Sequence, residues 1–139
     1  MYLLGFPLLL ITFAVYNIIA FLMPGVSWTG ALFSVHMVSG ADWAMSVGDL
    51  LITLAILLLA GEVMKSTRIG TRTILDHSLS LVLFLGMLVE FLLVKQTATG
   101  TFFVLLVISF VDVVAGFAVT LRSAQRDLTV EGVGGHLPT

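Results

Sequence analysis

Three acidic residues and one asparagine stand inside long apolar runs of the chain, and they are the residues best placed to do chemistry: Asn17, Asp49, Glu90 and Asp112. A charge at the centre of a bilayer costs about 2.5–3.5 kcal/mol on insertion scales, so such residues normally face protein or water. At 1.5 Å per residue, Asp49 is expected roughly 8 Å inside the outer end of its apolar run, and Asp112 near the middle of its own. Carboxyl and amide oxygens gathered in this way can bind a proton or a hard cation. We therefore predict an ion or proton site made of these four residues.

Two other roles for the same acids remain open. A carboxyl that keeps its proton can donate a hydrogen bond across helices and hold the bundle together. Acids can also act as stepping stones along a proton or cation path. Beyond Asp112, in the direction away from Glu90, only scattered hydroxyls such as Ser80 and Thr120 precede the next charged residues. The sequence therefore favours a pocket open to the outer side, or a seam completed in an oligomer, over a complete path through one chain.

The composition requires a membrane environment for these residues. The chain has 139 residues, of which 59% are hydrophobic and 10% charged, and its mean hydropathy is +1.16. Soluble domains carry about a quarter charged residues, and so little polar surface cannot cover a water-soluble particle. There are no cysteines, which excludes disulfides, thiolate metal sites and cysteine nucleophiles.

Four apolar stretches are long enough to cross a bilayer as helices, at roughly 3–23, 44–64, 73–94 and 101–121. Spanning helices need about 20 mostly apolar residues, and helices satisfy every backbone group internally. We predict an all-α, integral membrane four-transmembrane-helix bundle over residues 1–122, followed by a short cytoplasmic tail over 123–139. The first stretch is interpreted as a retained helix, because no basic leader or small-x-small cleavage site accompanies it.

Most basic residues fall on one side of these predicted spans: Lys65, Arg68, Arg72, Arg122 and Arg126. Only Lys95 falls on the other side. The positive-inside rule then places both termini and the basic loop in the cytoplasm, with the chain as a multi-pass membrane protein.

The basic loop between the second and third spans has an acid on each side. These residues predict an ion-pair collar at the inner interface, where charges can snorkel at little cost: Glu62, Lys65, Arg68, Arg72 and Asp76. Because Glu62 lies thirteen residues after Asp49, it is rotated away from the face of Asp49. We therefore assign Glu62 to the collar and not to the acid group.

Helical spacing predicts which faces turn inward. Small and polar residues recur at three- and four-residue steps along the fourth span: Ser109, Asp112, Gly116 and Thr120. Residues at these steps share one face of a helix, and small residues suit close helix contact. In the second span, Asp49 shares a face with Thr53 and Ala60. We expect all of these faces to point into the bundle.

The connection over residues 24–43 differs from the spans. It holds Trp28 and Trp43 near its ends, as in the aromatic belts at membrane interfaces. Apolar and polar residues alternate along 33–37, which is compatible with a short hairpin or with a segment lying on the bilayer surface. This connection is either an interfacial loop with no further role or a lid or docking surface for a partner.

Two stretches, "KSTRIGTRTILDHSLSLVLFLGMLVEFLL" and "TFFVLLVISFVDVVAGFAVTLRSAQRD", together with "VGDLL" in the second span, resemble the uncharacterised small four-helix inner-membrane proteins of alphaproteobacterial type. The resemblance covers about the second half of the chain and implies a fold, but no activity. No nucleotide-binding, serine-hydrolase or zinc-protease motif occurs. No basic patch large enough for nucleic acid is present.

We therefore expect a non-enzymatic integral membrane protein without a cofactor, surrounded by membrane lipids and assembled as a homo-oligomer or within a larger membrane complex. Its cation- or proton-interacting carboxylate site would make it a small channel or transporter. The alternative is an accessory or scaffold subunit, in which the acids pack helices and the connection over 24–43 docks a partner. Whether a metal binds is left undetermined.

Overall fold

The computed structural model describes residues 7–66 and 72–134, and this part of the chain contains four α-helices and one small hairpin. The helices are α1 (Leu9–Leu22), α2 (Val47–Ser66), α3 (Arg72–Leu93) and α4 (Gly100–Gly134). Strands β1 (Ala31–His36) and β2 (Asp42–Ser46) form the antiparallel hairpin between α1 and α2, and a short 3-10 turn, η2 (Lys95–Thr97), connects α3 to α4. The predicted helical architecture is confirmed, and the hairpin adds a small β element to it.

Three of these helices are long and apolar enough to cross a membrane: the segments Val47–Lys65, Leu75–Leu93 and Gly100–Arg122. Helix α1 is apolar but has only 14 residues. It is shorter than the predicted span over 3–23, whose residues 3–6 lie outside the described residues.

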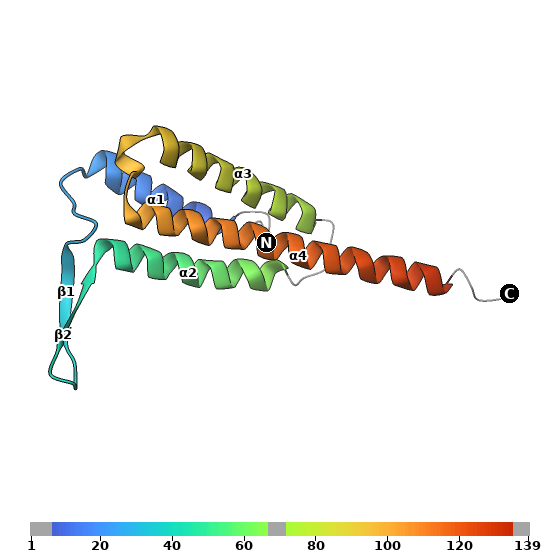
Figure 1. The fold of residues 1–139 in the computed structure, drawn as a ribbon, viewed down its shortest axis with the longest axis horizontal. Coiled ribbons are helices and arrows are strands. Elements are labelled where there is room, and N and C mark those ends of the chain that lie inside the picture. The colour runs from blue at the N-terminus through green and yellow to red at the C-terminus, as the bar shows by residue number, and fades with distance from the viewer. Residues whose placement is uncertain (1–6, 67–71, 135–139) are drawn as a thin grey trace.

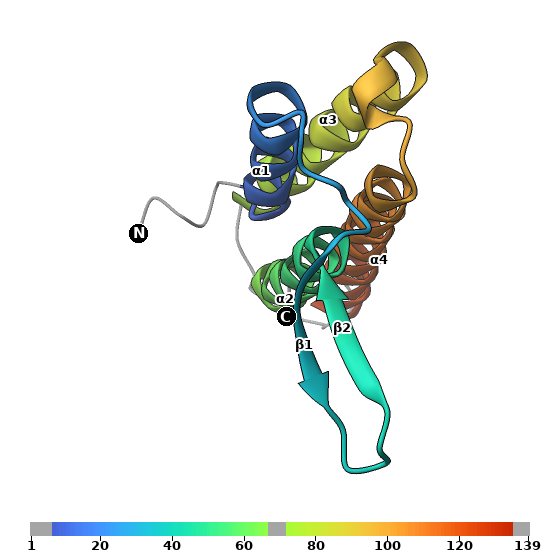
Figure 2. The ribbon, with the colours of Figure 1, turned by 90° about the vertical axis from the view of Figure 1, so that its left-hand side faces the viewer.

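Helix α4 is the centre of the bundle. It lies between α2 and α3, and α1 packs against α2 and α4 (Figures 1 and 2). The buried core is built from large side chains of several helices, among them Tyr16, Met87, Phe102 and Leu105. Phe91 of α3 stacks on Phe102 of α4 with ring centroids 6.1 Å apart. Aromatic pairs of this kind add to the burial energy of the helix contact.

The fourth helix continues farther than the sequence suggested. A tail was predicted from residue 123 onward, but α4 runs on to Gly134 and projects beyond α2 and α3 (Figure 1). The segment over 123–131 contains Ala, Gln, Arg, Leu and Glu, which are good helix formers. Gly132 and Gly134 follow it, and glycine favours the end of a helix.

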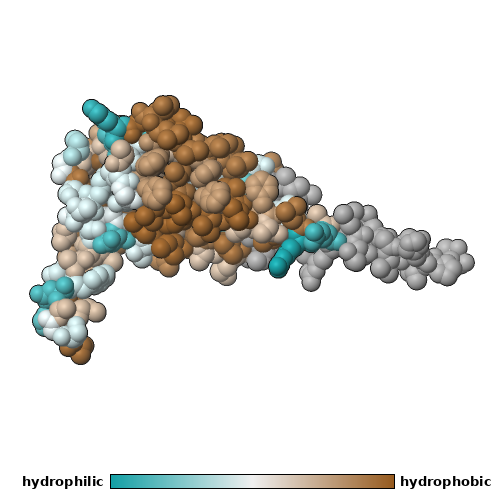
Figure 3. All heavy atoms as spheres, viewed as in Figure 1, coloured by the Kyte–Doolittle hydropathy of each residue, from teal (hydrophilic) through white to brown (hydrophobic). Residues whose placement is uncertain are grey.

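The outer faces of the helices are apolar. Figure 3 shows a continuous hydrophobic area over the middle of the bundle, with hydrophilic atoms gathered toward its two ends. Large aliphatic side chains of α2 and α3 such as Leu57, Leu92 and Leu93 are exposed. So extensive an apolar surface is unusual for a soluble monomer and is compatible with a membrane protein. Below, the end of the bundle that carries the hairpin is called the hairpin end, and the end from which α4 projects is called the tail end.

Candidate functional site

Asp49 lies at the start of α2 and is exposed. Its backbone N–H donates to Oγ of Ser46 (3.1 Å), and the N–H of Ser46 donates back to Oδ2 of Asp49 (3.2 Å). This reciprocal pair is a capping box, which satisfies two donors at the helix N-terminus. Thr53 and Ala60, on the same helical face, are also exposed. The expected inward orientation of this face is therefore wrong, because α2 begins at Val47 and uses Asp49 as a cap.

Glu90 and Asn17 do meet, at the hairpin end. Nδ2 of Asn17 lies 3.4 Å from Oε2 of Glu90 and donates a shorter bond of 2.9 Å to the carbonyl of Phe13. The Glu90 carbonyl accepts a bond of 2.8 Å from the hydroxyl of Thr97. Two of the four predicted site residues are thus brought together, in a group that fastens α1 to the end of α3.

Asp112 lies in a different place, toward the tail end. Its side chain is on the buried face of α4, and the residue is 6% exposed. The side chains that act on its carboxyl electrostatically are Glu62 and Lys65 of α2 and the hydrogen-bonding hydroxyl of Ser80 on α3. Glu62 keeps its predicted ion pair with Lys65, but its separation from the predicted acid group does not extend to Asp112. Although Glu62 is rotated away from Asp49 on α2, the packing of α2 against α4 brings its charge close enough to act on Asp112.

Glu62 is itself 6% exposed and has two partners that define its position. One carboxylate oxygen, Oε1, accepts a hydrogen bond from the backbone N–H of Leu8, at the N-terminus of α1. The same oxygen lies 3.4 Å from Nζ of Lys65. A carboxylate is favoured at a helix N-terminus, where unpaired N–H groups carry partial positive charge. Glu62 thus links α1 to α2 as well as facing Asp112.

Helix α3 contributes His77 and Asp76 to the same region. The ring of His77 lies directly against α4 at Gly116, where an added Cβ would come within 2.4 Å of its Nδ1. Asp76 and Glu62 both act electrostatically on the imidazole. We call the following residues the tail-end polar cluster: Glu62, Lys65, Asp76, His77, Ser80, Ser109 and Asp112.

Several polar atoms of this cluster have unused hydrogen-bonding capacity. Ser109 precedes Asp112 by three residues on the same face of α4 and is 1% exposed. Within the described part of the chain, no hydrogen bond reaches its Oγ, Nε2 of His77 or Oδ1 of Asp76. Buried polar atoms are normally paired, so these three atoms leave capacity for a further donor or acceptor in the cluster.

The predicted collar is present in part. Glu62 and Lys65 form its ion pair. Asp76 lies near His77. Arg68 lies outside the described residues, and α3 begins at Arg72, whose side chain is also outside the described part.

The two polar groups are separated by apolar core. Ser80 and Glu90 are ten residues apart on α3, which corresponds to about 15 Å along a helix. Leu83 and Met87 are buried between them. Asn17, Asp49, Glu90 and Asp112 therefore do not form one site. Among the described residues, no three side chains of the types that bind metals gather closely enough to hold a metal ion.

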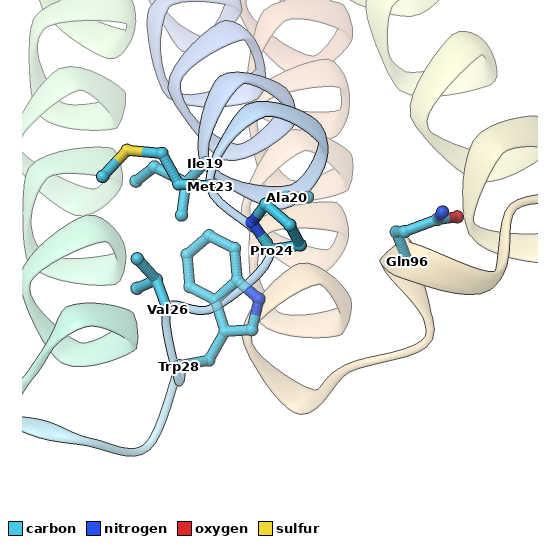
Figure 4. A pocket seen from close by; sticks show the side chains of 7 residues that line it. All are labelled: Ile19, Ala20, Met23, Pro24, Val26, Trp28 and Gln96. Atoms are coloured by element: carbon cyan, nitrogen blue, oxygen red, sulfur yellow. The ribbon is translucent and has the colours of Figure 1, made fainter.

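A pocket of about 240 Å³ opens at the hairpin end, away from both acid groups (Figure 4). It is lined by Ile19, Ala20, Met23, Pro24, Val26, Trp28 and Gln96. The indole of Trp28 stacks on Tyr16 with ring centroids 4.3 Å apart. The lining is apolar except for the Gln96 amide, so this pocket carries no acid–base chemistry of its own.

Comparisons with protein-family models, curated proteins and solved structures find no match. The features that bear on function are therefore the pair Asn17 and Glu90 at the hairpin end and the tail-end polar cluster. One signal in the sequence identifies the role of Asp49, since Ser46-x-x-Asp49 ahead of an apolar run is the pattern of a capping box. No comparable local signal links Glu62 to Asp112, because their proximity depends on how α2 and α4 pack.

Proposed function

We propose that the chain is an integral membrane protein whose tail-end polar cluster binds a proton at Asp112, as part of a small proton- or cation-linked transporter. The observation that carries this proposal is the position of Asp112. Asp112 is 6% exposed inside an apolar bundle, and a second acid, Glu62, is buried to the same extent and acts on its carboxyl electrostatically. Intramembrane acids in such positions are costly and mark proton or ion sites more often than other residues do.

A proton suits this cluster better than a metal ion. Glu62 already accepts bonds from Leu8 and Lys65, which leaves Asp112 as the carboxyl free to change its state. Two carboxyls close together favour sharing a proton over carrying two charges. The unpartnered hydroxyl of Ser109 supplies a further hydrogen-bonding group one turn away on the same helix. A metal ion is less well served, because among the described residues no three side chains of the types that bind metals gather closely enough to hold one.

The cluster leads to one side of the membrane. His77 and Asp76 lie between Asp112 and the tail-end terminus of α3, and imidazole is the side chain best suited to pass protons near neutral pH. On the other side of Asp112 the buried polar side chains are the hydroxyls of Ser109 and Thr12, and the described residues bury no carboxyl, amine or imidazole there as far as Glu90. The proposed site thus exchanges protons with the tail end, whereas a pocket open to the outer side was expected from the sequence. A path across the whole membrane would need a second copy or a conformational change.

The placement in the membrane is part of the proposal. The three long apolar helices support it, and the distribution of basic residues supports a cytoplasmic tail end. On this basis we place the protein in a bacterial inner membrane, with α1 as a fourth span and both termini in the cytoplasm. A homo-oligomer or a larger complex would supply the missing half of a path.

The test is proton flux in liposomes that contain the purified protein, measured with a trapped pH-sensitive dye under an imposed potassium gradient. We expect Asp112→Asn to abolish the flux, since the amide keeps the shape of the carboxyl but cannot take up and release a proton near neutral pH. We expect Glu62→Gln to reduce the flux. Asp49→Asn is the matched control, because it removes a carboxylate at an exposed position and its amide oxygen can still accept the bond from the N–H of Ser46. Equal flux from wild type and Asp112→Asn would refute the proposal.

A second measurement reports proton binding without transport. Infrared difference spectra between low and high pH should contain the carbonyl stretch of a buried protonated carboxyl, and this band should be lost in Asp112→Asn but kept in Glu90→Gln. If no such band changes and no flux is seen, the accessory or scaffold function becomes the better proposal. The bond from the N–H of Leu8 to Glu62 supports that second candidate, because it joins α1 to α2.

A further inference from the structure

The β-hairpin has two chemically different faces. Its register pairs Phe33 with Met45 and Val35 with Trp43, so these four side chains share one face of the ribbon. The rings of Phe33 and Trp43 pack edge to face with centroids 6.3 Å apart. The opposite face pairs Ser34 with Ala44 and His36 with Asp42. We call these the apolar face and the polar face of the hairpin.

The apolar face is not covered by the rest of the described chain. Phe33 is 48% exposed and Trp43 is 44% exposed, and every residue of β1 is exposed. The tip adds Met37 and Val38, both exposed. On the polar face, Nδ1 of His36 and Oδ1 of Asp42 are 2.7 Å apart. These two residues are the only ionisable ones of the hairpin, so it offers no excess of either charge to an oppositely charged partner.

The position of the hairpin is set by its connection to α2. Strand β2 ends at Ser46 and α2 begins at Val47, with no residue between them. The apolar segment Val47–Lys65 has 19 residues, or about 28 Å of helix, which matches a hydrocarbon core of about 30 Å. If α2 spans the membrane, the root of the hairpin must lie at the edge of the hydrocarbon layer.

The direction of the hairpin completes the argument. It extends across the helix axes and not along them, away from the side of the bundle (Figures 1 and 2). A strand of six residues is about 20 Å long, so the ribbon would run along the membrane surface for that distance. In Figure 3 the hydrophilic atoms of the hairpin lie on the side that faces away from the helices. The side toward the helices is the side on which lipid would lie.

We propose that the hairpin lies flat on the bilayer interface at the hairpin end, with its apolar face and tip in the lipid and its polar face in water. Its partner is the lipid of the same membrane, and the binding is hydrophobic and independent of anionic headgroups. Trp43 lies on the apolar face, and its amphipathic ring fits the preference of tryptophan for the interface. The inference rests on the membrane placement proposed above, and it does not depend on the proton site.

The test uses single cysteines, since the natural chain has none. Val35→Cys lies on the apolar face and Ser34→Cys, its neighbour, on the polar face, so the pair differs only in orientation. Leu57→Cys, on the exposed face of α2, reports whether the bundle is in lipid. Each variant is labelled with a nitroxide in liposomes of zwitterionic lipid. Collisions are then measured with oxygen, which concentrates in lipid, and with a water-soluble nickel chelate.

We expect the label at position 35 to collide mainly with oxygen and the label at position 34 mainly with nickel. A water-soluble maleimide should react about tenfold more slowly at 35 than at 34, if that cysteine must first leave the lipid at a cost similar to exposing a buried valine. Equal nickel accessibility at 34 and 35, with Leu57→Cys protected, would overturn the proposal. Spin–spin broadening at 35 would overturn it in favour of a second copy on this face. Nickel accessibility at positions 34, 35 and 57 together would contradict the proposal that the helices lie in a membrane.

Discussion

At the scale of single residues, Gly116 and Asp49 both have structural roles: Gly116 allows a close contact between two helices, and Asp49 caps the start of one. Gly116 has no Cβ, and this lets the ring of His77 lie against the backbone of α4 one turn from Asp112. Asp49 has the chemistry expected of a site residue but is used as an exposed helix cap with Ser46. An acid in an apolar stretch therefore indicates a functional site only if it lies inside the helix and not at its first turn.

Gly116→Ala should destabilise the bundle. The new Cβ would lie 2.4 Å from Nδ1 of His77, and overpacking of this kind typically costs about 1–3 kcal/mol. Gly86→Ala on α3 is the matched control. Nothing lies within 4 Å of a Cβ there, so the better helix propensity of alanine should leave stability unchanged or raise it by up to about 1 kcal/mol. Thermal unfolding in a mild detergent, monitored by circular dichroism, ranks the variants by their stability.

The double variant Gly116→Ala, His77→Ala checks the cause. Removing the ring should recover most of the stability lost in Gly116→Ala, because the clash no longer exists. If the two losses instead add, the destabilisation comes from α4 itself and not from the contact with His77.

At the scale of elements, α1 is held at both of its ends. At the tail end, the N–H of Leu8 is bonded to Glu62. At the hairpin end, the hydroxyl of Tyr16 lies 2.9 Å from the carbonyl of Gln96 and 2.7 Å from Oγ1 of Thr99. The Tyr16 ring is fully buried and stacks on Trp28. These contacts compensate for the shortness of α1 and fix its direction.

Substitutions of Tyr16 should separate these contributions. Tyr16→Phe keeps the stacking and loses the two hydrogen bonds, so we expect a loss of about 1 kcal/mol in the free energy of unfolding. Tyr16→Ala also removes the buried ring, at a cost of about 3–5 kcal/mol. Ile18→Ala, on the exposed side of the same helix, should change stability little. Equal losses for Tyr16→Phe and Tyr16→Ala in detergent unfolding would show that the ring does not anchor α1.

The elements also show what can be predicted from sequence. Long apolar stretches predict the helices, and the spacing of Ser109, Asp112 and Gly116 correctly predicts the buried face of α4. Periodicity within one helix does not say which residue of another helix lies at the same level. The approach of Glu62 to Asp112, and the separation of Asp112 from Glu90, depend on helix packing and could not be read from any single segment. The resemblance to uncharacterised four-helix proteins remains a hypothesis.

At the scale of the whole molecule, the main question is whether α1 crosses the membrane. Its 14 residues extend only about 21 Å, less than a hydrocarbon core of about 30 Å. Leu8 nevertheless meets Glu62 near the tail end of α2, and the N–H of Gly48, at the other end of α2, donates to the carbonyl of Trp28 (2.9 Å). The chain from Leu8 to Trp28 therefore runs antiparallel to nearly the whole length of α2.

We expect α1 to cross with α2 and both termini to lie on the side of the basic loop, as the positive-inside rule requires. Reporters that are active only in the cytoplasm should therefore be active at either terminus. A cysteine replacing Ser34, on the polar face of the hairpin, should react with a membrane-impermeant maleimide from outside intact cells. Ala124→Cys, on the projecting part of α4, is the control and should react only after the membrane is permeabilised. Termini on opposite sides would leave three spans, and α1 would then lie within the bundle without crossing, because Glu62 and Tyr16 hold it there and lipid does not.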